Sequence, residues 1–310
     1  LLSKSAIDET HRQFMGVFAG RMSREEISSY VENSDCLLVL GAYVSDMDTG
    51  VYSAQMDTTK VVHATDEHLR ISRHVYEKVG FKDVVNAVTD LKLPRNFEPD
   101  YPRIATLPGA SAGDPDEKLT VSTLFARLAP EITTKTVVIA DPGDALFGAI
   151  DLPIKDGKDF IACGYYASLG FAVPAAIGVA TADPNLRPIV LVGDGAFQMT
   201  GMELSVAVRY GYDPIIIVLN NDGYLTERLI LEGDFNDITP WHFAKLPEVL
   251  GSGHGEVVQT NAAFTQALSD AIARRGQYSL IEAKLDRMDC SDALRRLGAA
   301  MHALVSSKEH

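Results

Sequence analysis

The sequence has few cysteines, a shortage of positive charge and no long apolar run. Its three cysteines, Cys36, Cys163 and Cys290, lie far apart, and such a sparse odd set is typical of the reducing cytoplasm. With 28 Lys and Arg against 42 Asp and Glu, the net charge is −14, which argues against a nucleic-acid partner. No apolar stretch approaches the ~20 residues of a membrane span. We therefore expect a cytoplasmic protein without nucleic-acid or membrane partners.

Motifs for metal binding by histidine and for secretion are also missing. The eight histidines show no HxH or HExxH spacing, so we expect His63, His68, His74 and His242 to be surface or packing residues. The first residues lack the apolar region of a signal peptide. Hydrophobic residues make up 46% and charged residues 23% of the chain, as in ordinary globular proteins, and 310 residues suggest about two domains.

The stretch Ile189–Glu227 carries the strongest pattern. The apolar runs Ile189–Val192 and Ile215–Leu219 suit strands buried in a parallel sheet, and the helix-length segment Phe197–Tyr210 lies between them. Ligands of open α/β sheets bind outside the carboxyl ends of the strands. The residues that follow the two strands should therefore meet in one crevice.

An acid and an amide stand at these two strand ends. Asp194 and Asn221 offer hard oxygen ligands of the kind that bind Mg²⁺ or Ca²⁺. Gly193 and Gly195 permit close approach of the backbone to a ligand, and the helix beginning near Ala196 would aim free N–H groups at a phosphate. The local chemistry indicates a metal ion together with a phosphate group, although a sheet with two polar turns is the alternative interpretation.

Gly193-Asp194-Gly195, then 24 residues, then Asn220-Asn221 resembles the thiamine diphosphate signature of GDG followed by NN. The continuation from Asn221 to Glu227 is similar to the 2-oxo acid decarboxylases that act on pyruvate, indolepyruvate and phenylpyruvate. The resemblance implies thiamine diphosphate and Mg²⁺ as cofactors and a small 2-oxo acid as substrate. The dinucleotide-binding fingerprint of a dehydrogenase fails, because Gln198 stands where it needs glycine.

The resemblance also assigns roles to single residues. It implies that Asp194, Asn221 and the Gly223 carbonyl hold the metal. Leu169 would support the cofactor from beneath, and the Ala167 carbonyl would accept from its exocyclic nitrogen. The implied cofactor-binding residues are Asp144, Ala167, Leu169, Gly193, Asp194, Gly195, Ala196, Asn221, Gly223 and Tyr224. On local sequence alone, Leu169 could equally be a core residue and Asp144 a turn residue.

Glu227 is the candidate catalytic residue. It lies four residues after Gly223, about one helical turn, so its carboxyl can face the crevice and take part in proton transfer. The alternative is a solvated helix glutamate beside Arg228. Leu225 and Thr226 are candidates for the substrate pocket. Thr226 replaces the larger isoleucine of some relatives, which favours a larger 2-oxo acid. The segments Gly164-Tyr165-Tyr166 and Phe235-Asn236-Asp237 resemble the phenylpyruvate and indolepyruvate branch, which implies an aromatic substrate.

Two doubly wound, parallel-sheet α/β domains are predicted, the second a thiamine diphosphate-binding fold. Within them we expect a capping box formed by Ser23 and Glu26, a buried strand at Cys36–Leu40, a strand at Thr136–Ala140 and a helix at Ser168–Ala180. The predicted boundaries are 1–93 for a middle domain truncated at its N-terminus, 94–118 for a linker rich in proline, and 119–310 for the diphosphate- and Mg²⁺-binding domain. The GxSxG match at residues 109–113 lacks the flanking strand and helix of a nucleophile elbow, so we interpret it as linker.

The resemblance covers the C-terminal half of such an enzyme. It implies that a pyrimidine-binding domain absent from this chain completes the site, and that the intact enzyme is a homodimer or homotetramer. Two alternatives to a decarboxylase stay open. One is a catalytically incomplete cofactor-binding half or partner subunit. The other is a carboligating thiamine diphosphate synthase, which Glu227 disfavours.

Overall fold

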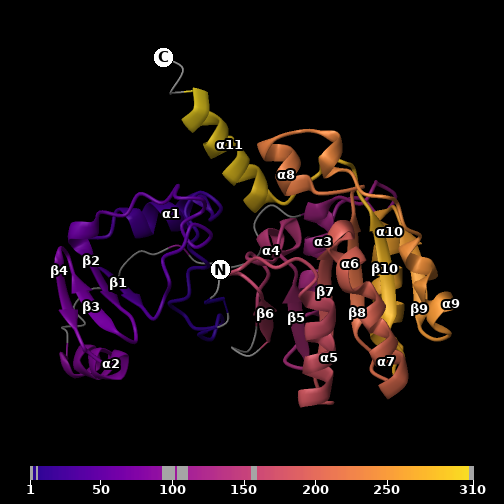
Figure 1. The fold of residues 1–310 in the computed structure, drawn as a ribbon, viewed down its shortest axis with the longest axis horizontal. Coiled ribbons are helices and arrows are strands. Elements are labelled where there is room, and N and C mark those ends of the chain that lie inside the picture. The colour runs from indigo at the N-terminus through magenta and orange to yellow at the C-terminus, as the bar shows by residue number, and fades with distance from the viewer. Residues whose placement is uncertain (1–2, 5, 93–101, 103–110, 155–158, 307–310) are drawn as a thin grey trace.

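The computed structural model describes residues 3–4, 6–92, 102, 111–154 and 159–306, with side chains described up to residue 299. Within these ranges the strands form two separate sheets, one of four strands and one of six. Figure 1 shows the four-stranded sheet in the indigo and violet part of the chain and the six-stranded sheet in the part that runs to yellow. The predicted α/β class is confirmed.

The first sheet is mixed and has the order β1-β2-β3-β4. Its strands are β1 (Leu37–Leu40), β2 (Val61–Ala64), β3 (His68–Ile71) and β4 (His74–Glu77). Only β1 and β2 pair in parallel, because the short connections between β2, β3 and β4 allow antiparallel hairpins alone. The helices α1 (Glu25–Glu32) and α2 (Phe81–Asp90) flank this sheet in sequence.

The second sheet is parallel throughout and has the order β6-β5-β7-β8-β10-β9. Its strands are β5 (Thr136–Ala140), β6 (Phe160–Ala162), β7 (Arg187–Gly193), β8 (Ile215–Asn220), β9 (His254–Val258) and β10 (Ser279–Lys284). From β5 the chain passes first to β6 on one side and then to β7 on the other. The carboxyl ends of β5 and β7 therefore flank the point where the strand order reverses, which is where open sheets bind ligands.

Helices cover both faces of this sheet. The helices are α3 (Val121–Leu128), α4 (Asp144–Ala149), α5 (Ala172–Ala182), α6 (Asp194–Thr200), α7 (Leu204–Tyr210), α8 (Leu225–Ile230), α9 (Leu246–Leu250), α10 (Asn261–Ala273) and α11 (Asp292–Ser306). Alternate residues of β7 face opposite layers: Ile189 and Leu191 pack with α3, α4 and α10, whereas Val190 and Val192 pack with α5, α6 and α7. The core thus fixes where the strand ends lie.

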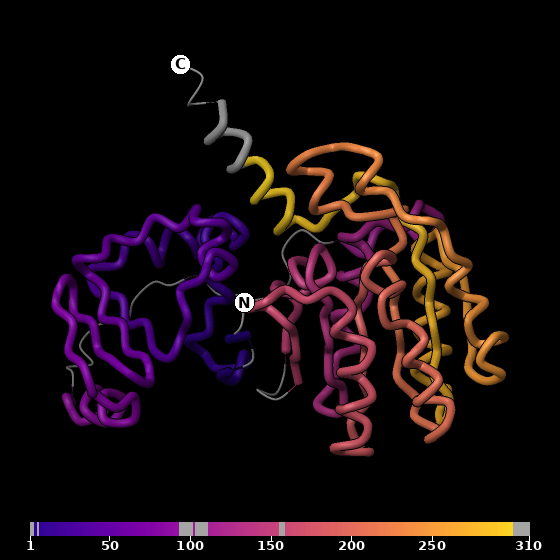
Figure 2. The backbone as a smooth tube through the Cα atoms, in the orientation of Figure 1, coloured from indigo at the N-terminus to yellow at the C-terminus, as the bar shows by residue number. Residues whose placement is uncertain are grey.

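The two parts of the chain meet through an apolar cluster and a buried ion pair. Figure 2 shows the N-terminal segment lying beside the six-stranded part. A shared cluster joins Ala19 and Met22 of that segment to residues of α4, α8 and α11. Beside it, Lys4 Nζ donates to the carbonyls of Ile150 (3.1 Å) and Leu152 (2.8 Å) and pairs with Glu9 Oε1 at 3.0 Å.

Three local predictions need correction. The proposed capping box of Ser23 and Glu26 is wrong: Arg24 precedes α1 without a side-chain cap, and the Ser23 hydroxyl accepts from the Ala19 N–H instead. The strand expected to be buried at Cys36–Leu40 alternates between partly buried and exposed residues, since β1 forms an edge of its sheet. The helix expected from Ser168 begins only at Ala172.

The segment between the strands β7 and β8 is also more broken than expected. It forms α6, a 3₁₀ turn at Gly201–Glu203 and α7. The boundaries 1–93, 94–118 and 119–310 stay predictions, because most of the linker, including Gly109 and Ala110, lies outside the described residues. Among the helices that the structure describes, none has the length and apolar character needed to cross a membrane.

Loss of the buried lysine should uncouple the N-terminal segment from the second sheet. Lys4→Met removes the partner of Glu9, whose side chain is only 4% exposed, and leaves two buried carbonyls without their donor. We expect the free energy of unfolding to fall by about 3–5 kcal/mol, because a buried charge is left unpaired. Urea unfolding of the wild type and of Lys4→Met measures this difference in the free energy of unfolding. Lys245→Met, which breaks the exposed pair with Glu248, serves as control and should change little. Equal effects of the two variants would contradict a stabilising role for Lys4.

Candidate cofactor-binding site

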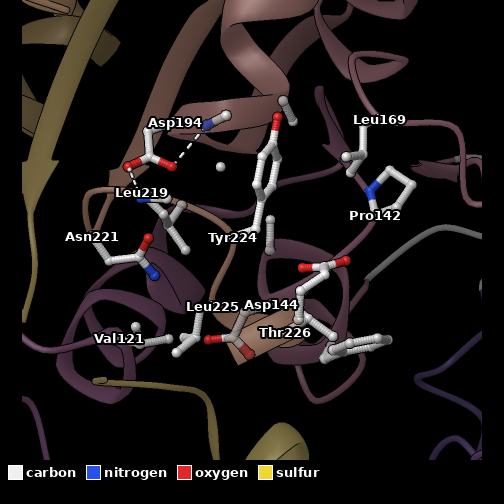
Figure 3. A pocket seen from close by; sticks show the side chains of 18 of the residues that line it. Val121, Pro142, Asp144, Leu169, Asp194, Leu219, Asn221, Tyr224, Leu225 and Thr226 are labelled. Carbon is white, nitrogen blue, oxygen red and sulfur yellow. Dashed lines mark hydrogen bonds between the residues drawn. The ribbon is translucent and has the colours of Figure 1, made fainter. Parts of the chain in front are cut away.

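A cavity of about 270 Å³ lies at the carboxyl ends of β5, β7 and β8. Figure 3 shows its lining side chains converging from loops that are far apart in sequence. Every residue that the sequence predicted for the site lines this one cavity: Asp144, Ala167, Leu169, Gly193, Asp194, Gly195, Ala196, Asn221, Gly223, Tyr224 and Glu227. The fold therefore brings the predicted set together, while the role of each residue stays a prediction.

Asp194 joins two of these loops. It is the first residue of α6 and is 1% exposed. Its carboxylate accepts from its neighbour Gly195 N–H at 2.7 Å and, across the cavity, from the Gly223 N–H at 3.1 Å. Burial raises the pKa of Asp194 to about 6, and the backbone N–H groups partly offset that rise. A buried carboxylate that is costly to ionise gains most from a bound cation.

Asn221 and Gly223 complete an oxygen set around Asp194. Asn221 is buried, and its side-chain amide makes no hydrogen bond to any described residue. The Gly223 carbonyl likewise accepts none within the described part of the chain. Nowhere in the described ranges do three His, Cys, Asp or Glu side chains gather as metal ligands. A carboxylate, an amide and a carbonyl nevertheless fit Mg²⁺ that completes its coordination with phosphate oxygens and water.

The start of α6 offers a close backbone approach. A side chain at Gly195 is excluded, since its Cβ would lie 2.5 Å from a ring carbon of Tyr224. The Gly195 N–H already donates to Asp194, whereas the Ala196 N–H has no acceptor among the described residues. Of the two predicted donors to a diphosphate, Ala196 is therefore the one left available.

The loop that carries Ala167 and Leu169 is held by a residue that the sequence analysis passed over. Asp141, fully buried after β5, accepts from the N–H groups of Gly170 (2.9 Å) and Ala172 (2.7 Å). Burial raises its pKa to about 6. Ala167 adopts a left-handed backbone with φ 50°, which is strained for a residue with a Cβ. The one sequence signal for Asp141 was its position at a strand end.

Asp144 lines the cavity, but both its carboxylate oxygens are used by α11. They accept from the backbone N–H of Ser291 at 2.8 Å and from its hydroxyl at 2.5 Å. Burial is the main reason that the pKa of Asp144 rises to about 6, and the charge of Asp289 adds to it. Direct contact of this carboxylate with a cofactor stays a prediction. What the structure shows is a link between the cavity and the start of α11.

Glu227 lies on α8 at the rim of the cavity and is exposed. It forms no hydrogen bond or ion pair with a described residue, and its neighbour Arg228 is turned away from it into the interior. Leu225 and Thr226 line the same cavity, as predicted. Two further lining residues, Met47 and Phe147, were missed because Met47 arrives from the first part of the chain and Phe147 has no distinctive motif.

Comparison with known proteins identifies both parts of the chain. Residues 143–283 match the family model described as "Thiamine pyrophosphate enzyme, C-terminal TPP binding domain", and residues 1–91 match "Thiamine pyrophosphate enzyme, central domain". Thiamine pyrophosphate is the same compound as thiamine diphosphate. The range 1–91 contains the whole four-stranded sheet, and the range 143–283 contains most of the six-stranded sheet but not β5.

Named relatives agree with these matches. The chain is 32% identical over 304 residues to an alpha-keto-acid decarboxylase of Mycobacterium bovis, covering 96% of this chain and 54% of the relative. It is 37% identical over 290 residues to an indole-3-pyruvate decarboxylase of Azospirillum brasilense, covering 91% and 52%. The chain thus spans about half the length of the curated relatives it matches.

A solved structure supports the fold. The chain is similar, with a TM-score of 0.68 and 23% sequence identity, to the thiamine diphosphate-dependent 4-hydroxybenzoylformate decarboxylase of Rhodococcus jostii RHA1. The similarity covers 90% of this chain and 54% of that protein. At this identity, it speaks for the fold alone.

Replacing Asp144 by asparagine should weaken the dependence of stability on pH. Because its folded pKa of about 6 exceeds the ordinary value of 3.8, the folded state binds the proton more tightly. The free energy of unfolding should therefore fall as pH rises from 4 to 6. In Asp144→Asn we expect this fall to shrink by about 1–3 kcal/mol. Urea unfolding at several pH values measures it, with Asp270→Asn at an exposed position as control. Equal pH slopes in wild type and Asp144→Asn would contradict the assignment.

Proposed function

The chain belongs to the thiamine pyrophosphate enzymes, and from this premise we propose that it supplies the cofactor-binding half of a non-oxidative 2-oxo acid decarboxylase. The reaction would convert a 2-oxo acid into an aldehyde and CO₂. One observation carries the proposal: the oxygen set of Asp194, Asn221 and Gly223 lines the same cavity as an unpaired carboxyl, Glu227. The oxygen atoms of Asp194, Asn221 and Gly223 suit the binding of the cofactor with its cation, and the carboxyl of Glu227 suits proton transfer.

The cofactor would be thiamine diphosphate with Mg²⁺. When bound, it supplies the nucleophilic carbon that adds to the 2-oxo group and the electron sink that receives the bonding pair as CO₂ leaves. In this chain, Asp194, Asn221 and the Gly223 carbonyl would hold the cation. The Ala196 N–H would donate to the diphosphate, and Leu169 would support the rings from its side of the cavity.

Glu227 would handle the proton that the reaction needs after CO₂ departs. Its carboxyl lines the cavity, and no ion pair or hydrogen bond with a described residue ties it down. A group in this position can exchange protons with solvent and also reach a reacting atom in the cavity, as a general acid requires. The apolar neighbours Leu225 and Val121 would exclude water from the same space.

For the substrate we propose an aromatic 2-oxo acid, such as indolepyruvate or phenylpyruvate. The cavity lining that includes Thr226 also includes the apolar side chains of Met47, Val121, Phe147 and Leu225. Thr226 is a small side chain within this group. The Azospirillum brasilense relative, which is named for indole-3-pyruvate, gives independent support for this class.

The coverage of relatives favours a second candidate function. The chain spans about half of their length. For a cofactor-binding half or partner subunit, we propose that a separate pyrimidine-binding domain completes the site, within a homodimer or homotetramer in the cytoplasm. On its own the chain would then bind the cofactor without turnover, as a partner subunit or an incomplete half. A carboligating synthase stays a weaker alternative, since the position of Glu227 in the cavity suits protonation.

Measurement of CO₂ release with pyruvate, phenylpyruvate and indolepyruvate, with and without thiamine diphosphate and Mg²⁺, tests the proposal. Release that depends on the cofactor supports a decarboxylase. Glu227→Gln should then lower kcat by about 10²–10⁴-fold, because general acid–base catalysis contributes that much, while cofactor affinity stays nearly unchanged. Glu131→Gln, at an exposed position that does not line the cavity, is the matched control.

Two outcomes separate the candidates. Cofactor binding without release of CO₂ from any substrate would favour the incomplete half. Failure of the chain to bind thiamine diphosphate at all, measured by calorimetry, would contradict the cofactor assignment and with it the proposed function.

A further inference from the structure

Arg228 is buried directly behind the turn that carries Asn221 and Gly223. Its side chain is 0% exposed, although the sequence places it next to the exposed Glu227 on a short helix. A fully buried guanidinium is costly unless its donors are satisfied and its charge is paired. The contacts of the Arg228 side chain therefore explain how a buried positive charge is tolerated at this position.

Three of its four hydrogen bonds are to backbone carbonyls, and two of these carbonyls belong to the turn. Nη1 donates to the Asn221 carbonyl at 3.1 Å, and Nη2 donates to the Asp222 carbonyl at 2.5 Å. Nη1 also reaches the Arg287 carbonyl at 3.4 Å, which links the turn to the loop after β10. The planar fork of arginine can address several carbonyls at fixed angles, which a lysine ammonium cannot do.

These contacts leave one carbonyl of the turn free. Arg228 takes those of Asn221 and Asp222, whereas the Gly223 carbonyl accepts no hydrogen bond from a described residue. The turn needs such support because Asp222 (φ 62°) and Gly223 (φ 141°) both have positive φ, and a Cβ at Gly223 would lie 2.5 Å from Arg228 Nη2. The absence of a side chain at Gly223 thus leaves room for the Arg228 guanidinium.

The charge of Arg228 is balanced by Asp237, which forms an isolated β-bridge with Gly223 of the turn. Asp237 Oδ1 accepts from Arg228 Nη2 at 3.0 Å and also pairs with Arg287. These two arginines hold the pKa of Asp237 below its ordinary range. The segment before Asp237 supports the turn as well, since the Asn236 carbonyl accepts from the Tyr224 N–H at 2.9 Å.

We propose that Arg228 is the positioning residue that sets the shape of the Asn221–Gly223 turn, so that the Asn221 amide and the Gly223 carbonyl are presented to a divalent cation beside Asp194. This inference rests on the proposed function for the identity of the cation. Arg228 touches neither substrate nor cofactor and acts through the turn. Partners that orient metal ligands from behind are commonly worth 10–100-fold in metal affinity.

Three variants test the proposal by two readouts. Arg228→Met removes the contacts with the carbonyls, Arg228→Lys keeps the charge but not the fork, and Arg287→Met removes a partner of Asp237 while leaving the turn untouched. Amide hydrogen exchange at Gly223 and Tyr224, measured without any cofactor, reports on the turn itself. Calorimetric titration of Mg²⁺ in the presence of thiamine diphosphate reports on the cation.

We expect Arg228→Met to speed exchange at Gly223 by about 10-fold and to weaken Mg²⁺ affinity by about 10–100-fold, with Arg228→Lys in between. Arg287→Met should behave as wild type in both readouts. Unchanged exchange and affinity in Arg228→Met, or equal changes in Arg287→Met, would overturn the proposal. If Arg228→Met does not fold, the same two measurements are compared between Arg228→Lys and Arg287→Met. Changes in Arg228→Lys alone support the proposal, and wild-type values in both variants overturn it.

The proposed function and the proposed role of Arg228 can be contradicted separately. If the wild-type chain binds no thiamine diphosphate or Mg²⁺, the proposed function fails. The exchange readout then still decides whether Arg228 shapes the turn, because that measurement needs no ligand.

Discussion

The site depends on one hydrogen bond between two strand ends. The Gly223 N–H donates to the Asp194 carboxylate and so fixes the loop after β8 to the loop after β7, which are separated by a whole helical crossover. The sheet alone brings the strand ends near each other, but it does not set the orientation of the loops beyond them. The acceptor is a buried carboxylate, and burial raises its pKa because a negative charge is unfavourable there. The hydrogen bond from Gly223 stabilises the charged form of this carboxylate in the lining of the cavity.

Other buried charges extend this arrangement outward. Asp141 holds the loop of Leu169, Asp144 holds the start of α11, and Arg228 holds the turn of Asn221. Asp141 and Arg228 contact backbone groups of loops that line the cavity, whereas Asp144 itself lines the cavity and contacts Ser291 outside it. Buried charges cost stability unless they are fully satisfied, so their concentration around one cavity indicates that loop geometry is maintained there at the expense of stability.

The sequence predicted the second sheet well and the details of its loops poorly. Runs such as Ile215–Leu219 are apolar on both faces, which favours interior parallel strands. The bounds of β5 and β8 were therefore predicted to within one residue, whereas β7 begins two residues before the predicted run and ends one residue after it. Ser23 and Glu26 have the spacing of a capping box, yet tertiary contacts direct Ser23 to Ala19 instead. The edge strand β1 was judged buried because an apolar run does not reveal which strand lies at an edge.

For the site, the sequence motif identified the residues that line the cavity. It did not identify the residues that keep the lining loops in position. Glycine and carboxylate spacing identified Asp194, Gly195 and Gly223, since their chemistry is local to the chain. The sequence analysis gave Arg228 no role and mentioned it only as the neighbour of Glu227, whereas successive residues of a helix point in different directions. A buried arginine contacting carbonyls 6 and 7 residues earlier leaves no periodic signal. Such supporting residues become visible only once the backbone of the turn is known, because their role lies in contacts with that backbone.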